Sequence, residues 1–203
     1  MASTKTQQVV VTSPRKRDPD RPAKILNSAA ALFAANGYHS VGLSEIGASA
    51  GIVGSGIYRH FNSKYSVLTA LLEQAMATLL RGAEEITTRG SGSSGTTLRE
   101  LVRQQIEFCL DRKVEVQLYR QEISSLEEAD AKRLRRMQRR YNEEWIATLL
   151  ELRPELDETS ARSLVNAVIG AIQSIANYDS GLPREVTFRQ YEAIAESCFR
   201  SRW

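Results

Sequence analysis

The stretch GIVGSGIYRHFNSK, residues 51–64, combines a glycine-rich turn with four side chains that donate hydrogen bonds. Tyr58, Arg59, His60 and Lys64 offer a hydroxyl, a guanidinium, an imidazole and an ammonium group. On one helical turn and the start of the next helix, such donors can follow a row of phosphate groups. Glycine costs a helix about 1 kcal/mol relative to alanine, but it lets backbone N–H groups approach an anion or a base edge closely. The chemistry that this stretch favours is contact with a polyanion.

Each of these side chains also has an ordinary interpretation when it is taken singly. Tyr58 could be a core residue, His60 a surface histidine and Arg59 a solvated charge. The distribution of charge favours the polyanion, because residues 1–64 carry a net charge of +5 and the rest of the chain carries −2. A basic head on a nearly neutral body is typical of polyanion binding, although a solvated basic tail gives the same count.

Two other kinds of site are disfavoured. Gly51 and Gly56 have the spacing of a phosphate-binding loop, but an isoleucine and a tyrosine follow where such a loop needs Lys and Ser or Thr, and no strand precedes it. An enzyme would need a nucleophile, a base or a metal set, whereas His39 and His60 are the only histidines and neither is grouped with a cysteine or an acid. We therefore expect no catalytic residues, no metal site and no cofactor.

Cysteine usage and hydropathy indicate the compartment. Cys109 and Cys198 have no CxxC spacing and no neighbouring histidine, which argues for a reducing compartment and against zinc. We interpret both as small core residues. No apolar stretch approaches the roughly 18 residues that a membrane-spanning helix needs, so we expect a cytoplasmic protein that does not interact with a membrane.

The elements that position residues 51–64 are expected to be short helices. Asp20 can cap the N-terminus of a first helix, and Gly37 can end that helix in the left-handed backbone conformation. Two short helices joined by a tight turn and packed on a longer one form the helix-turn-helix pattern, in which the helix after the turn enters the major groove of DNA by its N-terminal end. The expected helices of this part span 21–36, 43–50, a third from about 54, and 63–81.

The remainder of the chain also has helical periodicity. The segment 87–97 is a flexible linker by composition, and Thr187 with Gln190 forms a capping box for the last helix. Because period-two alternation is nowhere sustained, the predicted fold class is all-α with about nine helices. The later helices are expected over 98–111, 114–125, 127–152, 158–177 and 187–201. The predicted organisation is a disordered basic arm (1–20), a helix-turn-helix domain (21–66) and a larger helical domain (67–203), to which the resemblance described next assigns ligand binding and dimerisation.

Residues 29–72 closely resemble the N-terminal DNA-binding domain of the TetR family of bacterial transcriptional regulators. The matching motifs are LFAANGY (32–38), EIGASAGI (45–52), IYRHF (57–61) and NSK (62–64). The rest of the chain resembles the family only in length and helicity. The resemblance implies a homodimer that binds a near-palindromic operator in double-stranded DNA, usually as a repressor, and is released by a small-molecule effector. The alternative is a helical interaction protein without specific DNA binding.

Carried over position by position, the resemblance implies a set of DNA contacts. Tyr58, His60 and Lys64 correspond to phosphate contacts, and Arg59 to a contact with bases or backbone. The usual Ser or Thr cap of the turn is Val53 here, and two positions that often read bases are glycines. We therefore expect sequence reading to rest on Ser55, Arg59, DNA shape and the basic arm. The candidate DNA-binding residues are Arg21, Lys24, Gly42, Ser44, Val53, Gly54, Ser55, Gly56, Tyr58, Arg59, His60 and Lys64.

The C-terminal part offers candidate residues for an effector and for a second subunit. Apolar and aromatic side chains there can line a cavity for a hydrophobic effector, although such a stripe is more often plain core. The run KRLRRMQRR, 132–140, is usually a solvated face, but it could receive the phosphates of an acyl-CoA. The last two helices carry small and apolar residues that suit a four-helix dimer interface, with intramolecular core as the alternative. The ligand candidates are Phe108, Tyr119, Tyr141 and Trp145, and the dimer candidates are Leu164, Ala167, Val168, Ala171, Ile172, Ile175, Tyr191, Ile194 and Phe199.

Overall fold

The computed structural model describes residues 20–52, 54–90 and 92–201, and every regular element in these ranges is helical. The predicted all-α class is confirmed, with eight α-helices and two 3-10 helices in the described ranges against the nine helices expected. Of the predicted arm, residues 1–19 lie outside the described residues, as does Val53. The elements are α1 (Arg21–Asn36), α2 (Leu43–Ser49), η1 (Gly54–Arg59), α3 (Lys64–Arg89), α4 (Ser94–Asp111), α5 (Lys113–Glu122), α6 (Glu128–Leu152), α7 (Glu158–Gln173), η2 (Ser174–Ala176) and α8 (Arg184–Arg200).

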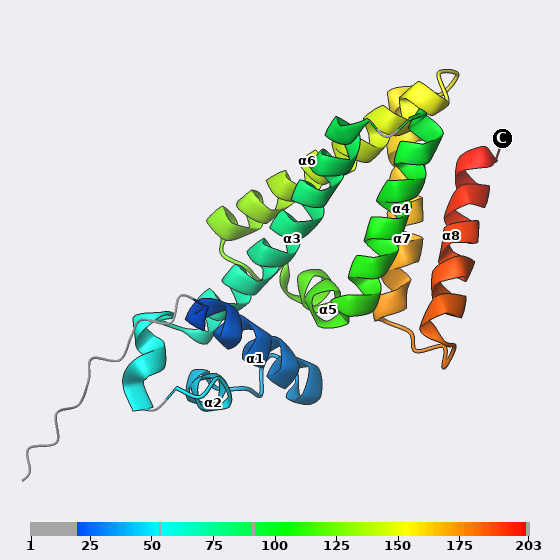
Figure 1. Cartoon of the computed structure of the whole chain (residues 1–203). Helices are drawn as coiled ribbons and strands as arrows, with labels where there is room; N and C mark the ends of the chain where they lie inside the picture. Colours follow the sequence, from blue (N-terminus) through cyan, green and yellow to red (C-terminus); the bar gives the residue numbers. More distant parts are fainter. Residues whose placement is uncertain (1–19, 53, 91, 202–203) are drawn as a thin grey trace, which may run out of the picture.

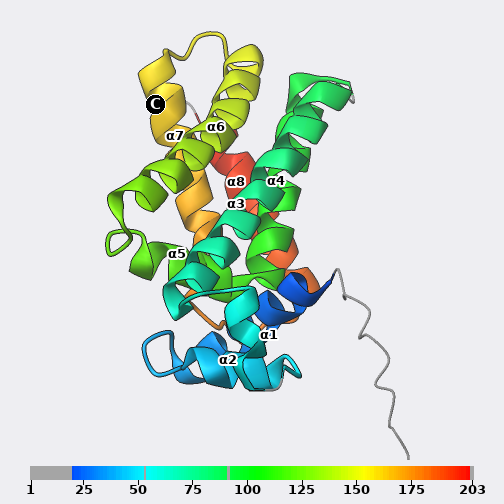
Figure 2. The same cartoon turned by 90° about the vertical axis from the view of Figure 1, so that its left-hand side faces the viewer.

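The helices α1, α2 and η1 form a small module at one end of the molecule, and α3 leads from it along the whole helical bundle (Figures 1 and 2). The module closes around Ile25, Ile46 and Ile57, each of which is fully buried. Gly37 and Gly51 end α1 and α2 with φ angles of +78° and +69°, which side chains rarely tolerate. These stops fix the two turns, so the boundaries of α1 and α2 agree closely with the sequence-based expectation.

In the larger bundle, α4, α5 and α6 pack against α3, and α7 packs against α4 and α6, with α8 at the outer edge beside α4 and α7 (Figure 1). Its centre holds Trp145, Leu101, Leu134 and Leu149, all fully buried. One continuous cluster of buried apolar side chains runs from Ile25 in α1 into α8. Movements in the bundle can therefore reach the N-terminal module through packed side chains.

Three predictions of linkers and helix caps differ from the structure. The linker expected over 87–97 is much shorter, because α3 continues to Arg89 and α4 begins at Ser94. The Ser and Gly residues there end and begin helices: Gly90 adopts the left-handed conformation after α3, and the Ser93 side chain accepts a hydrogen bond from the N–H of Thr96.

The other two differences concern helix starts. Pro183 is the N-cap of α8, so Thr187 is a buried residue inside that helix and the predicted capping box is wrong. Asp20 does occupy the N-cap of α1, but its side chain makes no capping hydrogen bond.

Cys109 is expected to resist alkylation in the folded protein. Burial raises the pKa of its thiol from 9.0 to about 12, and the hydrogen bond from Gln105 Nε2, at 3.3 Å, lowers it only in part. The thiol is neutral in the fold below this pKa, so its contribution to stability is complete below about pH 9 and is lost as the pH rises towards 12. Peptide mapping after iodoacetamide treatment at pH 8 should find Cys198 modified and Cys109 intact. Equal rates in the native protein would contradict this assignment.

Candidate nucleic-acid interface

The predicted tip of the helix-turn-helix is exposed at the far end of the N-terminal module (Figures 1 and 2). Tyr58 is 54% exposed, and the Ser55, Arg59 and His60 side chains are also exposed. Ile57 is fully buried within the same turn, so it anchors the backbone while its neighbours project outwards. The third helix is a 3-10 helix, η1, rather than the α-helix that was expected. The sequence therefore presents hydroxyl, guanidinium and imidazole groups on one short, internally anchored turn.

Backbone conformation and packing within the module explain why glycine occupies several positions at this tip. Gly51 needs its positive φ to make the turn, and a Cβ on Gly56 would lie 2.7 Å from Ile52 Cγ2. A Cβ on Gly47 would lie 3.2 Å from the Cβ of Ile57, so α2 and η1 approach each other closely there. Tight packing of the module thus explains these residues without any ligand, whereas the sequence suggested room for a ligand to approach.

The start of α2 presents Ser44 as an exposed side chain. Gly42 is the N-cap residue in an extended conformation, and its N–H donates to Glu45 Oε2 at 3.4 Å. The backbone contact predicted at Gly42 would therefore have to displace a long hydrogen bond to a carboxylate. At the start of α1, Arg21 is half-buried and Lys24 is exposed.

Lys64 has an internal role that the sequence did not reveal. Its Nζ donates to the carbonyl oxygens of Tyr38, at 2.9 Å, and of His39, at 3.0 Å, and it lies 4.6 Å from the centroid of the Tyr38 ring. These contacts use two of its three N–H donors and tie the turn before α2 to the start of α3. One N–H donor of this ammonium group remains for the predicted phosphate contact, which stays a prediction.

Replacing Lys64 with methionine is expected to reduce the free energy of unfolding by about 1–3 kcal/mol, because the part-buried carbonyl of Tyr38 and the exposed carbonyl of His39 lose a charged donor. Lys113→Met, at an exposed lysine at the start of α5, is the matched control and should change stability by less than about 0.5 kcal/mol. Urea unfolding without DNA measures both. Unchanged stability combined with lost DNA affinity would show instead that Lys64 acts by direct contact.

Three of the four predicted effector residues line one pocket in the bundle. Phe108, Tyr119 and Tyr141 surround a space of about 40 Å³, which has room for a few water molecules only. Trp145 lies outside this lining, fully buried, with ring centroids 6.0 Å from Tyr141 and 6.3 Å from Phe199. Trp145 is thus placed in the core, and a drug-sized ligand would need the pocket to open.

Polar groups also face this pocket. Tyr119 donates to Gln138 Oε1 at 2.7 Å, and Tyr141 donates to Gln105 Oε1 at 2.6 Å. Burial raises the pKa of both tyrosines, so they remain neutral donors at physiological pH. Within the described residues, the buried Oδ1 of Asn142 lacks a hydrogen-bond partner. A molecule with a suitably placed donor could therefore satisfy this oxygen.

The predicted dimer residues divide into two sets. Leu164, Val168, Ile172, Ile175 and Phe199 are buried in the core of this single chain, so they are not available to a second subunit. This corrects their assignment: the apolar stripe of α7 faces the chain's own bundle.

The other predicted dimer residues reach the surface. Ile194 is 40% exposed, Ala167 is exposed, and Ala171 and Tyr191 are half-buried. Only Thr187, Ala195 and Phe199 are buried among the 17 residues of α8. Much of α8 is therefore free to take part in an interface.

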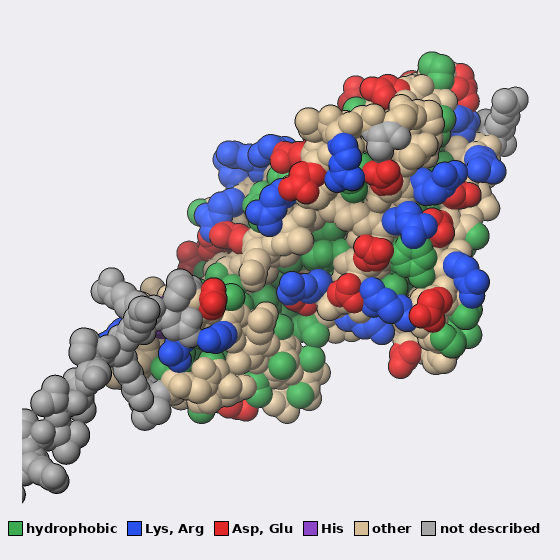
Figure 3. Space-filling view, in the orientation of Figure 1, with side chains coloured by type: hydrophobic (Ala, Val, Ile, Leu, Met, Phe, Trp, Pro, Cys, Tyr) green, Lys and Arg blue, Asp and Glu red, His purple; other side chains and the backbone are tan. Residues whose placement is uncertain are grey.

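The arginine-rich part of α6 is largely solvated. Arg133 pairs with Glu73 on α3 and with Asp130 on α6, and Arg140 pairs with Glu84 on α3. Lys132, Arg135, Arg136 and Arg139 are exposed. On the face of the bundle in Figure 3, basic and acidic side chains are interspersed. A solvated face explains this run.

Within the ranges 20–52, 54–90 and 92–201, no three or more His, Cys, Asp or Glu side chains form a cluster suited to a metal ion. No helix in the same ranges combines the length and the apolar character needed to cross a bilayer.

Comparison with known families assigns both parts of the chain. Residues 25–71 match the family described as "Bacterial regulatory proteins, tetR family", and residues 91–178 match the one described as "Tetracyclin repressor-like, C-terminal domain". Among solved structures, a bacterial regulatory protein in the tetR family from Rhodococcus RHA1 superposes with a TM-score of 0.79, over 92% of this chain and 100% of that one. At 15% identity, that likeness shows the fold alone.

Curated relatives match over shorter stretches. The HTH-type transcriptional activator FasR of Mycolicibacterium smegmatis is 32% identical over 66 residues, which is 32% of this chain and 30% of that protein. The HTH-type transcriptional repressor KstR2 of Rhodococcus jostii is 31% identical over 106 residues, 52% of each chain. The matches thus span about half or less of the length of these relatives.

Proposed function

Because the chain belongs to the TetR family of bacterial regulatory proteins, we propose that it is a transcriptional regulator that binds a near-palindromic operator as a homodimer. The observation that carries this proposal is the η1 turn, on which Ser55, Tyr58 and Arg59 are exposed around the fully buried Ile57. Tyr58 and His60 contact phosphates, and Ser55 and Arg59 face base edges in the major groove. Ser44 at the start of α2 adds a further phosphate contact.

The homodimer brings two such turns to one operator. We place its interface on the exposed side of α7 and α8, around Ala167 and Ile194, because α8 buries little of its surface in its own chain. A two-fold interface makes the same patch meet itself, which suits small residues such as Ala167. The operator's inverted repeat then mirrors the symmetry of the protein.

A small, mainly hydrophobic effector would act on DNA binding by opening the bundle pocket. Glu115 and Tyr119 of α5 line that pocket, and Glu122 at the end of the same helix lies 3.4 Å from His39 Nε2 in the turn before α2. A ligand that displaces α5 therefore moves the turn that positions α2. The effector thus favours a different spacing of the two DNA-binding tips and releases the operator.

We propose repression as the outcome of operator binding, since binding of the effector releases the operator and thereby relieves the repression. One curated relative is named an activator and another a repressor, so a reporter placed behind the operator decides between the two. A regulator of this kind works in the cytoplasm and needs no catalytic residue, metal or cofactor.

Selection of duplexes from a random library tests the proposal. The purified protein should enrich an inverted repeat, with half-sites about one helical turn or a multiple of it apart. Failure to enrich any sequence, with the protein folded and stable, would favour the alternative of a helical interaction protein.

A further inference from the structure

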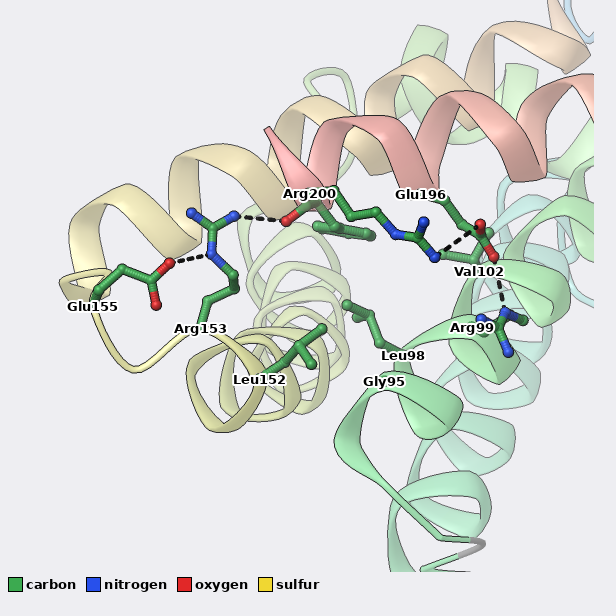
Figure 4. A pocket seen from close by; sticks show the side chains of 10 residues that line it. Gly95, Leu98, Arg99, Val102, Leu152, Arg153, Glu155, Glu196 and Arg200 are labelled. Atoms are coloured by element: carbon green, nitrogen blue, oxygen red, sulfur yellow. Dashed lines mark hydrogen bonds and ion pairs between the residues drawn. The ribbon is translucent and has the colours of Figure 1, made fainter. Parts of the chain in front are cut away.

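A second hollow lies at the end of the bundle where α4 begins and where α6 and α8 end, away from the N-terminal module (Figures 1 and 4). Its volume is about 390 Å³, against about 40 Å³ for the pocket in the bundle. The larger value falls within the range of known small-molecule sites. We call this hollow the distal groove; its lining residues come from the first turns of α4, the end of α6 with the loop after it, and the last turns of α8.

The floor of the distal groove is apolar. Leu98, Val102 and Phe199 are buried beneath it, whereas Leu152 forms a wall and is 41% exposed. Gly95 lies close to that wall, since a Cβ there would be 3.6 Å from Leu152 Cδ1. The buried floor and the exposed Leu152 side chain together offer an apolar surface for a hydrocarbon chain or ring.

Three arginines surround this floor (Figure 4). Arg153 is fixed by the fold, because it donates to the carbonyl oxygens of Phe199, at 2.7 Å, and of Ser201, at 3.1 Å. Arg99 donates through Nε to Glu196 Oε1 at 2.8 Å, and Arg200 lies 3.6 Å from the other oxygen of the same carboxylate. Glu196 thus bridges the two guanidinium groups, one at each carboxylate oxygen (Figure 4). Each guanidinium has five N–H donors, so both have further donors for another acceptor.

The charges that line the distal groove favour an anion with a single negative charge. Arg99, Arg153 and Arg200 face two carboxylates, Glu155 and Glu196, which leaves one positive charge in excess. One carboxylate neutralises that charge, whereas a diphosphate or triphosphate would bring several uncompensated negative charges next to Glu196. Arginine suits the planar carboxylate because it can bind both oxygens at once.

We propose that the distal groove is a binding site for a small amphipathic monocarboxylate, separate from the pocket inside the bundle. The carboxylate binds Arg99 and Arg200, and the apolar part lies over Leu98, Leu152 and Phe199. Such a ligand connects α4, the end of α6 and α8. It therefore holds α8, the helix with few buried residues, more firmly against the bundle.

Isothermal titration of the full chain with octanoate tests the site, with acetate and 1-octanol as probes for the head and the tail alone. Octanoate should bind once per chain, and acetate and 1-octanol each at least tenfold more weakly. Arg99→Gln should weaken octanoate binding at least tenfold. The matched control is Arg103→Gln, which removes a similar ion pair between α4 and α8, Arg103–Glu192 at 3.0 Å, outside the groove; it should change binding less than twofold.

A second variant fills part of the distal groove and keeps its three arginines. Gly95→Leu places a side chain against Leu152, where a Cβ makes only ordinary contacts, and should also weaken octanoate binding at least tenfold with thermal unfolding unchanged. The proposal is overturned if octanoate does not bind, if it binds both variants as tightly as the unchanged chain, or if 1-octanol binds equally well. Binding of several octanoate molecules per chain would likewise overturn it, as nonspecific adsorption.

Discussion

Replacing Tyr58 and Arg59 together with alanine should weaken operator binding about 100-fold or more and leave the free energy of unfolding nearly unchanged. Both side chains are exposed on η1. The variant keeps Ile57, the fully buried residue that anchors this turn. Each lost side-chain contact with DNA costs about 1–3 kcal/mol, and a dimer loses it twice. Fluorescence anisotropy with the selected inverted repeat measures the affinity.

The matched control for this variant removes the same two side-chain types elsewhere. Tyr178 and Arg81 are both exposed and lie on the larger bundle, so Tyr178→Ala with Arg81→Ala should bind the operator within about twofold of the unchanged chain. If Arg59 contacts a phosphate, its loss also reduces the salt dependence of binding. If it reads a base, its loss relaxes specificity at one position in each half-site. An unchanged affinity of the Tyr58 and Arg59 variant would remove η1 from the interface.

Introducing glutamate at Ala167 and Ile194 should convert the dimer to a monomer and weaken operator binding by about 100-fold or more. The two-fold axis of a dimer brings both copies of each glutamate into one interface, where like charges are desolvated together. A monomer places only one η1 turn on the operator and loses the contacts of the other half-site. Light scattering after size-exclusion chromatography gives the mass, and anisotropy gives the affinity.

Two exposed positions on α3 and α6, away from the proposed interface on α7 and α8, supply the control for the glutamate pair. Thr88 on α3 and Ala147 on α6 are exposed, and Thr88→Glu with Ala147→Glu should leave both the mass and the affinity unchanged. A dimeric Ala167→Glu, Ile194→Glu protein would place the interface elsewhere.

The N-terminal module could be predicted from the sequence because local signals determine it. Gly37 and Gly51 end their helices through a backbone conformation that few other residues adopt, and the apolar spacing of α1 matches its buried face. The role of Lys64 could not be predicted in this way, since it depends on carbonyl groups 25 and 26 residues earlier in the chain. Its spacing after Tyr58 suggested a phosphate contact just as well.

The larger bundle was predicted at the level of helices but not of surfaces. Periodicity shows that Leu164, Val168 and Ile172 share a face of α7, but it does not say whether that face meets its own chain or another; all three prove to be buried internally. Likewise, aromatic residues at helical spacing did not distinguish the core residue Trp145 from the pocket residues Tyr119 and Tyr141. The distal groove could not be predicted, because Arg99, Arg153 and Arg200 are far apart in the sequence and only the fold brings them together.

The most direct test of the account is the affinity of the unchanged protein for a duplex carrying the selected inverted repeat, titrated at several salt concentrations beside a scrambled duplex. The account predicts dissociation constants of about 10⁻⁸ M or tighter at physiological salt, at least 10³-fold weaker binding of the scrambled duplex, and an affinity that falls steeply as salt rises. Equal affinity for the two duplexes, or an affinity that does not change with salt, would contradict the claim that the η1 tip reads DNA.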